Sequence, residues 1–101
     1  MTEAKLVRKP HPIIKTVTYK GEEYEVNYSA MTSIRYQRRL ANAERDVAAY
    51  WDALDVVCCG RLDEYQERIP EPDGEMGEYG TSIDGLNAFI TAATEQAAAK
   101  N

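Results

Sequence analysis

The residue types that most often carry out chemistry are sparse in this chain. Its single histidine, His11, stands between two prolines, and no neighbouring group could orient it or share a metal ion with it. Its two cysteines, Cys58 and Cys59, are adjacent, whereas zinc ligands are usually about two to four residues apart. Neighbouring cysteines also rarely form a disulfide with each other. We therefore interpret His11 as a solvated side chain and Cys58 as a packing residue.

A second candidate site is the acidic segment of residues 70–80, where carboxylates are mixed with glycine and proline. An EF-hand calcium loop needs oxygen ligands at alternating positions and a glutamate at the twelfth. Counted from Asp73, the fifth position is Gly77 and the twelfth is Asp84, so the match is poor. We predict a mobile acidic loop over 70–80 that holds no metal, and we expect no cofactor.

Three arginines at helical spacing, Arg35, Arg38 and Arg39, are the most informative charged group in this acidic protein. They form either a solvated face balanced by nearby carboxylates or a patch for an acidic segment of a partner protein. We take the second interpretation as the candidate site. The predicted partner-binding residues are Arg35, Arg38, Arg39, Tyr36, Leu40 and Phe89.

Enzymatic activity is not expected. The sequence contains no glycine-rich phosphate loop, no nucleophile elbow and no carboxylate pair with identifiable support. A net charge of −5 argues against binding to nucleic-acid phosphates. The sequence has no signal peptide and no apolar run long enough to cross a bilayer, so we expect no membrane partner and a cytoplasmic location.

The elements that must position these residues follow from apolar periodicity. Alternation of apolar and polar residues over 13–28, interrupted near Gly21, predicts a β-hairpin with one buried face. Two strands alone are marginal in water, so helices must cover that face. With 101 residues, the chain has room for one domain. We predict a small α+β domain in which an N-terminal β-hairpin packs on three to four α-helices.

The remaining segments are assigned by helix periodicity, caps and breakers. Ser29 is the expected N-cap of the first helix, and Gly60 the expected C′ residue of the second. We expect helices over 30–43, 44–59, 61–69 and 82–97, a flexible arm over 1–12 and a frayed tail over 98–101. The second helix should form the core through an apolar face of Val47, Trp51, Leu54 and Cys58. The last helix should pack through Ile83, Leu86, Ile90, Ala93 and Ala97.

The layout as a whole resembles a known family. A strand-forming segment, residues 18–26, is followed by helices from Ser29, by the helical segment 52–60, by an acidic glycine-containing loop and by a last helix that ends in Ala-Lys-Asn. Over most of its length this arrangement is similar to the short tail assembly chaperones of long, non-contractile-tailed bacteriophages. The resemblance implies a protein that binds and solubilises the tape measure protein in the host cytoplasm and is absent from the mature virion.

The resemblance also implies a longer form of the protein, made by programmed frameshifting near the end of the gene, which recruits tail tube subunits. The final residues, 99–101, can be encoded as GCA-AAA-AAC, which contains the slippery heptamer A-AAA-AAC. The main alternative is a structural head–tail connector or tail completion subunit of the virion. A regulatory or host-directed binding module and a small enzyme are further alternatives.

Overall fold

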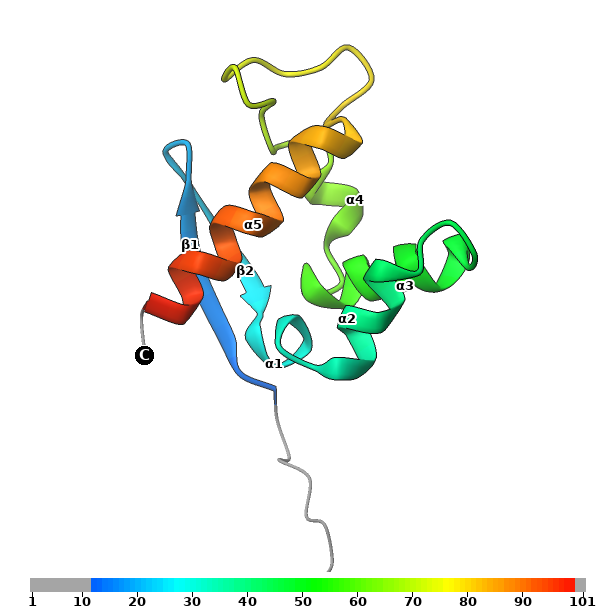
Figure 1. The fold of residues 1–101 in the computed structure, drawn as a ribbon. Helices are drawn as coiled ribbons and strands as arrows, with labels where there is room; N and C mark the ends of the chain where they lie inside the picture. Colours follow the sequence, from blue (N-terminus) through cyan, green and yellow to red (C-terminus); the bar gives the residue numbers. More distant parts are fainter. Residues whose placement is uncertain (1–11, 100–101) are drawn as a thin grey trace, which may run out of the picture.

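The structure, a computed structural model, describes residues 12–99 (Figure 1). Its elements are, in chain order, β1 (Ile14–Tyr19), β2 (Glu22–Asn27), α1 (Tyr28–Met31), α2 (Ile34–Ala41), α3 (Val47–Val57), α4 (Leu62–Tyr65) and α5 (Ile83–Ala99). The predicted fold class, a hairpin at the N-terminus followed by helices in one α+β domain, is confirmed. The predicted arm lies outside the described residues except for Pro12, and His11 lies outside them as well.

The hairpin is closed by the shortest common turn. Lys20 and Gly21 both have positive φ, 50° and 86°, which is the backbone of a type I′ turn. This turn sets an antiparallel register in which Val17 pairs with Tyr24. The side chains of Val17, Tyr24 and Val26 are fully buried on one face, and α5 lies across the hairpin (Figure 1).

Each edge of this two-stranded sheet is bonded to a side chain from another element. The Gln96 carboxamide of α5 accepts a hydrogen bond from the Thr18 N–H (2.7 Å) and donates one to the Thr18 carbonyl (2.9 Å). On the other edge, the Tyr65 hydroxyl of α4 donates to the Glu25 carbonyl (2.7 Å) and accepts from the Glu25 N–H (2.9 Å). These side chains bond to the backbone groups that neighbouring strands would otherwise pair with. They therefore protect the two edges of the hairpin, while packing against the helices stabilises it.

The centre of the core is a group of three aromatic rings. Phe89 of α5 packs edge-on against Tyr24 of β2 and Tyr65 of α4, with ring centroids 5.0 and 6.2 Å apart, and the two tyrosine rings are 5.1 Å apart. All three side chains are fully or almost fully buried. Burial raises the pKa of both tyrosines. Their hydroxyls are hydrogen-bonded, Tyr24 to the Arg68 carbonyl at 3.2 Å, so burial leaves neither one unsatisfied.

The predicted helix over 30–43 is two short helices, α1 and α2, separated by Thr32 and Ser33. Asn27 caps α1 by accepting a hydrogen bond from the Ala30 N–H, so the prediction of Ser29 as the cap is wrong. The Ser29 hydroxyl instead accepts a hydrogen bond from the Ile13 N–H at 2.8 Å. This bond joins the end of the hairpin to its beginning.

Helix α3, which corresponds to the helix predicted over 44–59, begins and ends at different residues from the prediction. Asp46 is its N-cap, and the Cys59 N–H and Gly60 N–H bond back to the Val56 and Asp55 carbonyls at 3.0 and 2.7 Å. This is a Schellman motif in which Cys59, with φ of 59°, occupies the left-handed C′ position. The prediction of Gly60 at C′ is therefore wrong by one residue.

The buried face of α3 also differs from the predicted one. Leu54 and Cys58 are buried as predicted, but Trp51 is 38% exposed and Val47 is 55% exposed. The first turns of α3 lie on the side of the molecule away from the hairpin (Figure 1). The apolar repeat of α3 therefore extends beyond the part of the helix that contacts the core. The prediction that Trp51 is a core residue is wrong.

The last part of the chain follows its prediction only in part. The segment predicted as a helix over 61–69 is helical only over α4. The final helix, α5, buries Leu86, Phe89, Ala93 and Ala97, but its first residue, Ile83, is 59% exposed. It continues to Ala99, so residues 98 and 99 of the predicted frayed tail are helical. The carbonyl of Ala97 accepts a hydrogen bond from Lys15 Nζ at 2.8 Å, a favourable position for a cation at a helix C-terminus.

Replacing Phe89 with alanine should remove the contact that joins the hairpin, α4 and α5. We expect Phe89→Ala to lower the free energy of unfolding by about 3–5 kcal/mol, measured by urea denaturation. Asn87→Ala, an exposed position on the same helix, is the control and should change it by less than about 0.5 kcal/mol. Equal effects of the two substitutions would contradict the central place of the Phe89 ring.

The left-handed backbone of Cys59 gives a second prediction. Because a Cβ atom in this conformation costs about 1–2 kcal/mol, Cys59→Gly should stabilise the protein by about 0.5–1 kcal/mol after the greater chain entropy of glycine is subtracted. Thermal and urea unfolding measure this gain. Cys59→Ala keeps the Cβ atom and should give little change. A gain of the same size in both variants would assign the effect to the thiol and not to φ.

Candidate functional site

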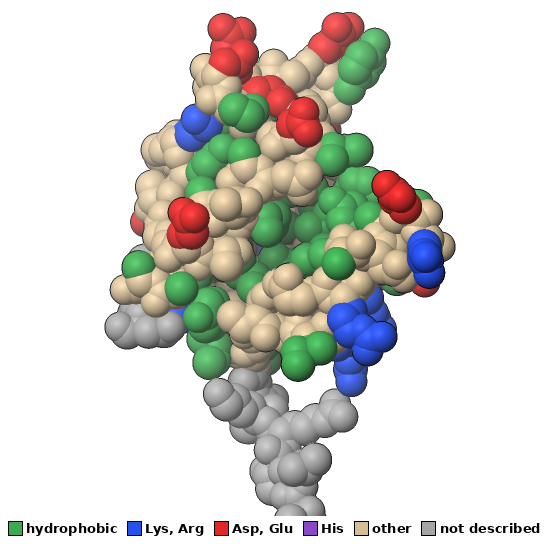
Figure 2. Space-filling model, viewed as in Figure 1, with side chains coloured by type: hydrophobic (Ala, Val, Ile, Leu, Met, Phe, Trp, Pro, Cys, Tyr) green, Lys and Arg blue, Asp and Glu red, His purple; other side chains and the backbone are tan. Residues whose placement is uncertain are grey.

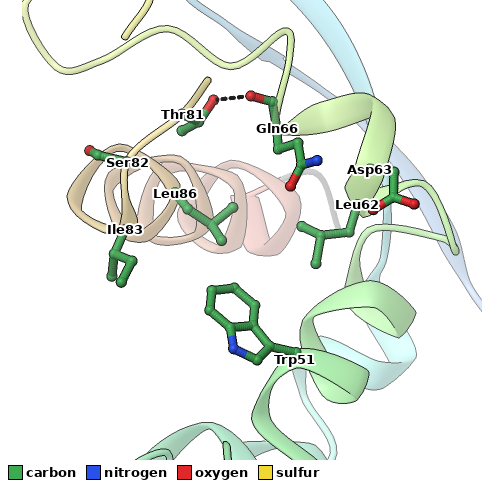
Figure 3. A pocket seen from close by; sticks show the side chains of 8 residues that line it. All are labelled: Trp51, Leu62, Asp63, Gln66, Thr81, Ser82, Ile83 and Leu86. Atoms are coloured by element: carbon green, nitrogen blue, oxygen red, sulfur yellow. Dashed lines mark hydrogen bonds between the residues drawn. The ribbon is translucent and has the colours of Figure 1, made fainter. Parts of the chain in front are cut away.

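A groove of about 340 Å³ lies between α3, α4 and the first turn of α5. Its apolar side chains are Trp51 from α3, Leu62 from α4, and Ile83 and Leu86 from α5, and these four residues define what we call the apolar groove. Figure 3 shows the Trp51 ring extending from α3 toward the space between Leu62 and Leu86. In the space-filling view, hydrophobic side chains gather in a hollow between α5 and the α2–α3 pair (Figure 2).

The α5 wall of the groove is fixed by hydrogen bonds at the start of the helix. The Thr81 N–H and hydroxyl both donate to the Gln66 carbonyl, at 2.8 and 3.0 Å, which holds the start of α5 against the end of α4. The Glu71 carboxylate accepts hydrogen bonds from the Ser82 N–H at 2.6 Å and from the Ser82 hydroxyl. A carboxylate at a helix N-terminus is favourable because of the helix dipole. The two ends of the predicted mobile loop over 70–80 are thus anchored to the wall of the groove.

The hydroxyl groups of Thr81 and Ser82, at the start of α5, are already engaged within the chain. The Thr81 hydroxyl also donates to the Ile69 carbonyl, and the Ser82 hydroxyl accepts from the Gly85 N–H at 3.0 Å. Across residues 12–99, no buried side-chain nitrogen or oxygen lacks a hydrogen-bond partner. A small polar ligand needs a few convergent polar groups that are free to bind it. The surface the groove offers to an occupant is therefore mainly apolar.

A basic surface lies on the neighbouring α2 helix and the loop that follows it. Arg35, Arg38, Arg39 and Arg45 line a shallow hollow of about 910 Å³, and these four residues define what we call the basic face. The ion pairs found among the described residues involve Arg61 and Arg68, and none involves the basic face. Its charge is therefore not neutralised by direct contact with carboxylates in this part of the chain.

The six predicted partner-binding residues do not share one surface. Arg35, Arg38 and Arg39 are exposed on the basic face, as a contact surface requires. Tyr36 and Leu40 are half-buried and pack against the core. These two side chains attach α2 to the rest of the domain.

Phe89 is a correction to the predicted site. Its side chain is fully buried, so it is a core residue and cannot contact a partner on the folded surface. On the basis of periodicity, Phe89 flanks the apolar stripe of the last helix, whereas in the structure Phe89 is part of the stripe and Ile83 is outside it. Periodicity likewise places the groove residues Trp51 and Ile83 in the core, although both are exposed.

Neither thiol is suited to nucleophilic chemistry. Burial, with smaller contributions from Asp55 and Cys59, raises the pKa of Cys58 to about 12. Burial is also the main cause that raises the pKa of Cys59, and Glu25 adds to it. A reactive cysteine needs its pKa lowered toward neutrality, because the thiolate is the nucleophile. The packing interpretation of Cys58 agrees with its full burial.

Neither a metal-ligand cluster nor a membrane-spanning helix occurs among the described residues. No group of three or more His, Cys, Asp or Glu side chains within 12–99 is placed so that it could hold a metal ion. Among the helices described there, none has both the length and the apolar character needed to cross a membrane.

Comparison of the chain with models of known protein families, with curated proteins and with solved structures finds no match. The apolar groove and the basic face are therefore the features of the structure that bear on its function.

Proposed function

We propose that this chain is a tail assembly chaperone of a long, non-contractile-tailed bacteriophage. It binds the tape measure protein and keeps it soluble in the host cytoplasm, and it helps to recruit tail tube subunits without remaining in the mature virion. The observation that carries the proposal is the apolar groove, with the basic face on another side of α3. An apolar groove can cover apolar helical segments of a partner by binding alone, without a catalytic step.

The composition of this surface supports a protein partner. Tryptophan and arginine are the side chains most often found at the energetic centres of protein interfaces. Trp51 lines the apolar groove, and Arg45 lines the separate basic face. Single exposed apolar residues are common on any protein. Here Trp51 and Ile83 are brought together from distant parts of the chain, which favours a binding surface over scattered exposure.

Co-expression tests the proposal. We expect the tape measure protein of the same genome to be insoluble when expressed alone, and to become soluble and co-purify with this chain when the two are expressed together. The soluble fraction and the pull-down yield are the measurements. The Asn87→Ala variant, which changes an exposed residue outside the lining of the groove, should act like the parent protein.

Two results would count against the proposal. A tape measure protein that is equally insoluble with and without this chain would contradict the chaperone activity. Mass spectrometry of purified virions gives the second result: a fixed number of copies per particle would favour the head–tail connector or tail completion subunit.

The end of α5 is compatible with a longer form of the protein. Ala98 and Ala99 are exposed, and the last buried residue of the helix is Ala97. An added segment could therefore continue from this end without repacking the core. In the proposed function, one domain binds the tape measure protein while the extension recruits tail tube subunits.

The gene provides the test of this longer form. We expect A-AAA-AAC at codons 99–101, with an overlapping open frame one base back, and two products from the intact locus that are resolved by mass spectrometry. Synonymous recoding of Ala99 and Lys100 should abolish the longer product and leave the shorter one unchanged. A gene without an overlapping frame would remove the frameshift, although a chaperone of a single length would remain.

A further inference from the structure

The arginines of the basic face come from two neighbouring elements and line one hollow. Arg35, Arg38 and Arg39 are spaced by three and four residues along α2, which places them about one helical turn apart on one side of the helix. Arg45, from the loop before α3, lines the same hollow. Figure 2 shows basic side chains gathered at this corner of the molecule. Charges at this spacing can act together on one ligand.

The orientation of α2 is fixed by its other side. Tyr36 and Leu40, four residues apart, are half-buried and pack against the core. The Gln37 carboxamide donates a hydrogen bond to the Met31 carbonyl of α1 at 2.5 Å. The Arg39 guanidinium lies over the Tyr36 ring, 5.5 Å from its centroid. Because the helix is held in this way, its arginines are presented to solvent in a set order, which lowers the entropy that a ligand must remove on binding.

The positive charge of the hollow is not balanced locally. Its charged lining consists of four arginines and one aspartate, Asp46, a net charge of +3. The Asp46 carboxylate is the N-cap of α3 and accepts a hydrogen bond from the Ala49 N–H at 3.0 Å. Within residues 12–99 the ion pairs belong to Arg61 and Arg68, on other elements. The basic face is therefore a local excess of positive charge on a chain whose net charge is −5.

The size of the basic face and the charge of the rest of the chain favour a short acidic polypeptide as its ligand. Helix α2 has eight residues and is about 12 Å long. A nucleic acid carries phosphates along its whole length and would bring them against an acidic protein. A short polypeptide segment needs only a few carboxylates. Ile34, which also lines the hollow, is 76% exposed, and an apolar side chain of such a segment would cover it.

The basic face and the apolar groove meet α3 on opposite sides. The hollow of the basic face is lined by Ala49, and the groove is lined by Trp51. Two residues along an α-helix are about 200° apart around its axis. A ligand on the basic face therefore does not cover Trp51, and one on the groove does not cover the arginines.

We propose that the basic face is a second binding site, independent of the apolar groove, for a short acidic segment of a protein partner. Carboxylates about one helical turn apart on the segment pair with Arg35, Arg38 and Arg39, whose planar guanidinium groups bind carboxylates through paired hydrogen bonds. Because the two sites lie on opposite sides of α3, the chain can hold an acidic segment while its groove is occupied. This second site goes beyond the proposed function and does not depend on the identity of the partner named there.

The experiment uses the full chain and two labelled peptides that differ only in charge. Peptide A is a helix-forming peptide with glutamates at three- and four-residue spacing on one face, and peptide B has glutamines at the same positions. Fluorescence anisotropy of the label measures binding. We expect peptide A to bind about tenfold more tightly than peptide B at low salt. The difference should shrink as salt is added, because the screening length falls to about 8 Å at physiological ionic strength.

A pair of charge-matched variants locates the binding. Arg35→Gln combined with Arg38→Gln should weaken the binding of peptide A by about tenfold. Lys20→Gln combined with Arg61→Gln removes the same charge from exposed positions outside the basic face and should change the affinity by less than about twofold. Circular dichroism and thermal unfolding check that both variants are folded. Equal losses in the two variants would overturn the proposal, because they would show attraction to overall charge and no site.

The emission of Trp51 tests whether the two sites are independent. Trp51 is the single tryptophan of the chain, so its fluorescence reports on the groove. We expect peptide A to bind without changing this emission. A shift of the emission to shorter wavelength would place the peptide in the groove and overturn the independence of the second site.

Three further outcomes would also overturn the proposal. Equal binding of peptides A and B would leave the basic face as a solvated surface. A single-stranded oligonucleotide of the same net charge that bound more tightly than peptide A would assign the face to nucleic acid. An oligomer in light scattering that dissociates in the Arg35→Gln, Arg38→Gln variant would assign it to a second copy of the chain. Co-expression with the tape measure protein is a separate measurement, so failure of this site is distinguishable from failure of the proposed function.

Discussion

The edge-on packing of Phe89 against Tyr24 and Tyr65 is the interaction on which the rest of the structure depends. A domain of this size buries little apolar surface, and an isolated hairpin would not be stable. The Phe89 ring joins β2, α4 and α5, three elements separated in the chain. The same contact brings the Tyr65 hydroxyl to the edge of β2 and carries α5 past the edge of β1, where Gln96 bonds to it. Core packing and edge protection thus have one origin.

This arrangement decides which surfaces are left for function. Because α5 covers one face of the hairpin and side chains bond to its edges, the hairpin offers little to a partner. The apolar groove, lined by Trp51, Leu62 and Leu86, lies among the helices (Figure 3). The position of the apolar groove is in this sense a consequence of how the small sheet is stabilised.

Much of the fold could be predicted from the sequence, because alternation over 23–28 and the apolar repeat of α5 report directly on burial. The candidate site could be predicted only in part. The exposure of Arg35 follows from its type and position. From the sequence, Trp51 is expected in the core and Phe89 at the surface, which is the reverse of what the structure shows. Periodicity identifies the apolar face of a helix, but it does not tell how far the core extends along that face. In α3 the buried face begins near Leu54, about two turns after Val47, the first residue of the repeat.

The two walls of the groove are held with different strength. On the α5 side, Leu86 and Phe89 are buried and Thr81 is bonded to the end of α4. On the other side, Trp51 lies in the first turns of α3, where Val47 is exposed and burial begins only at Ala53. Elements with few buried apolar contacts open at a lower free energy than the core. A groove with one firm wall and one adaptable wall can fit helices that differ in side-chain size, which is what binding along a single long partner would require.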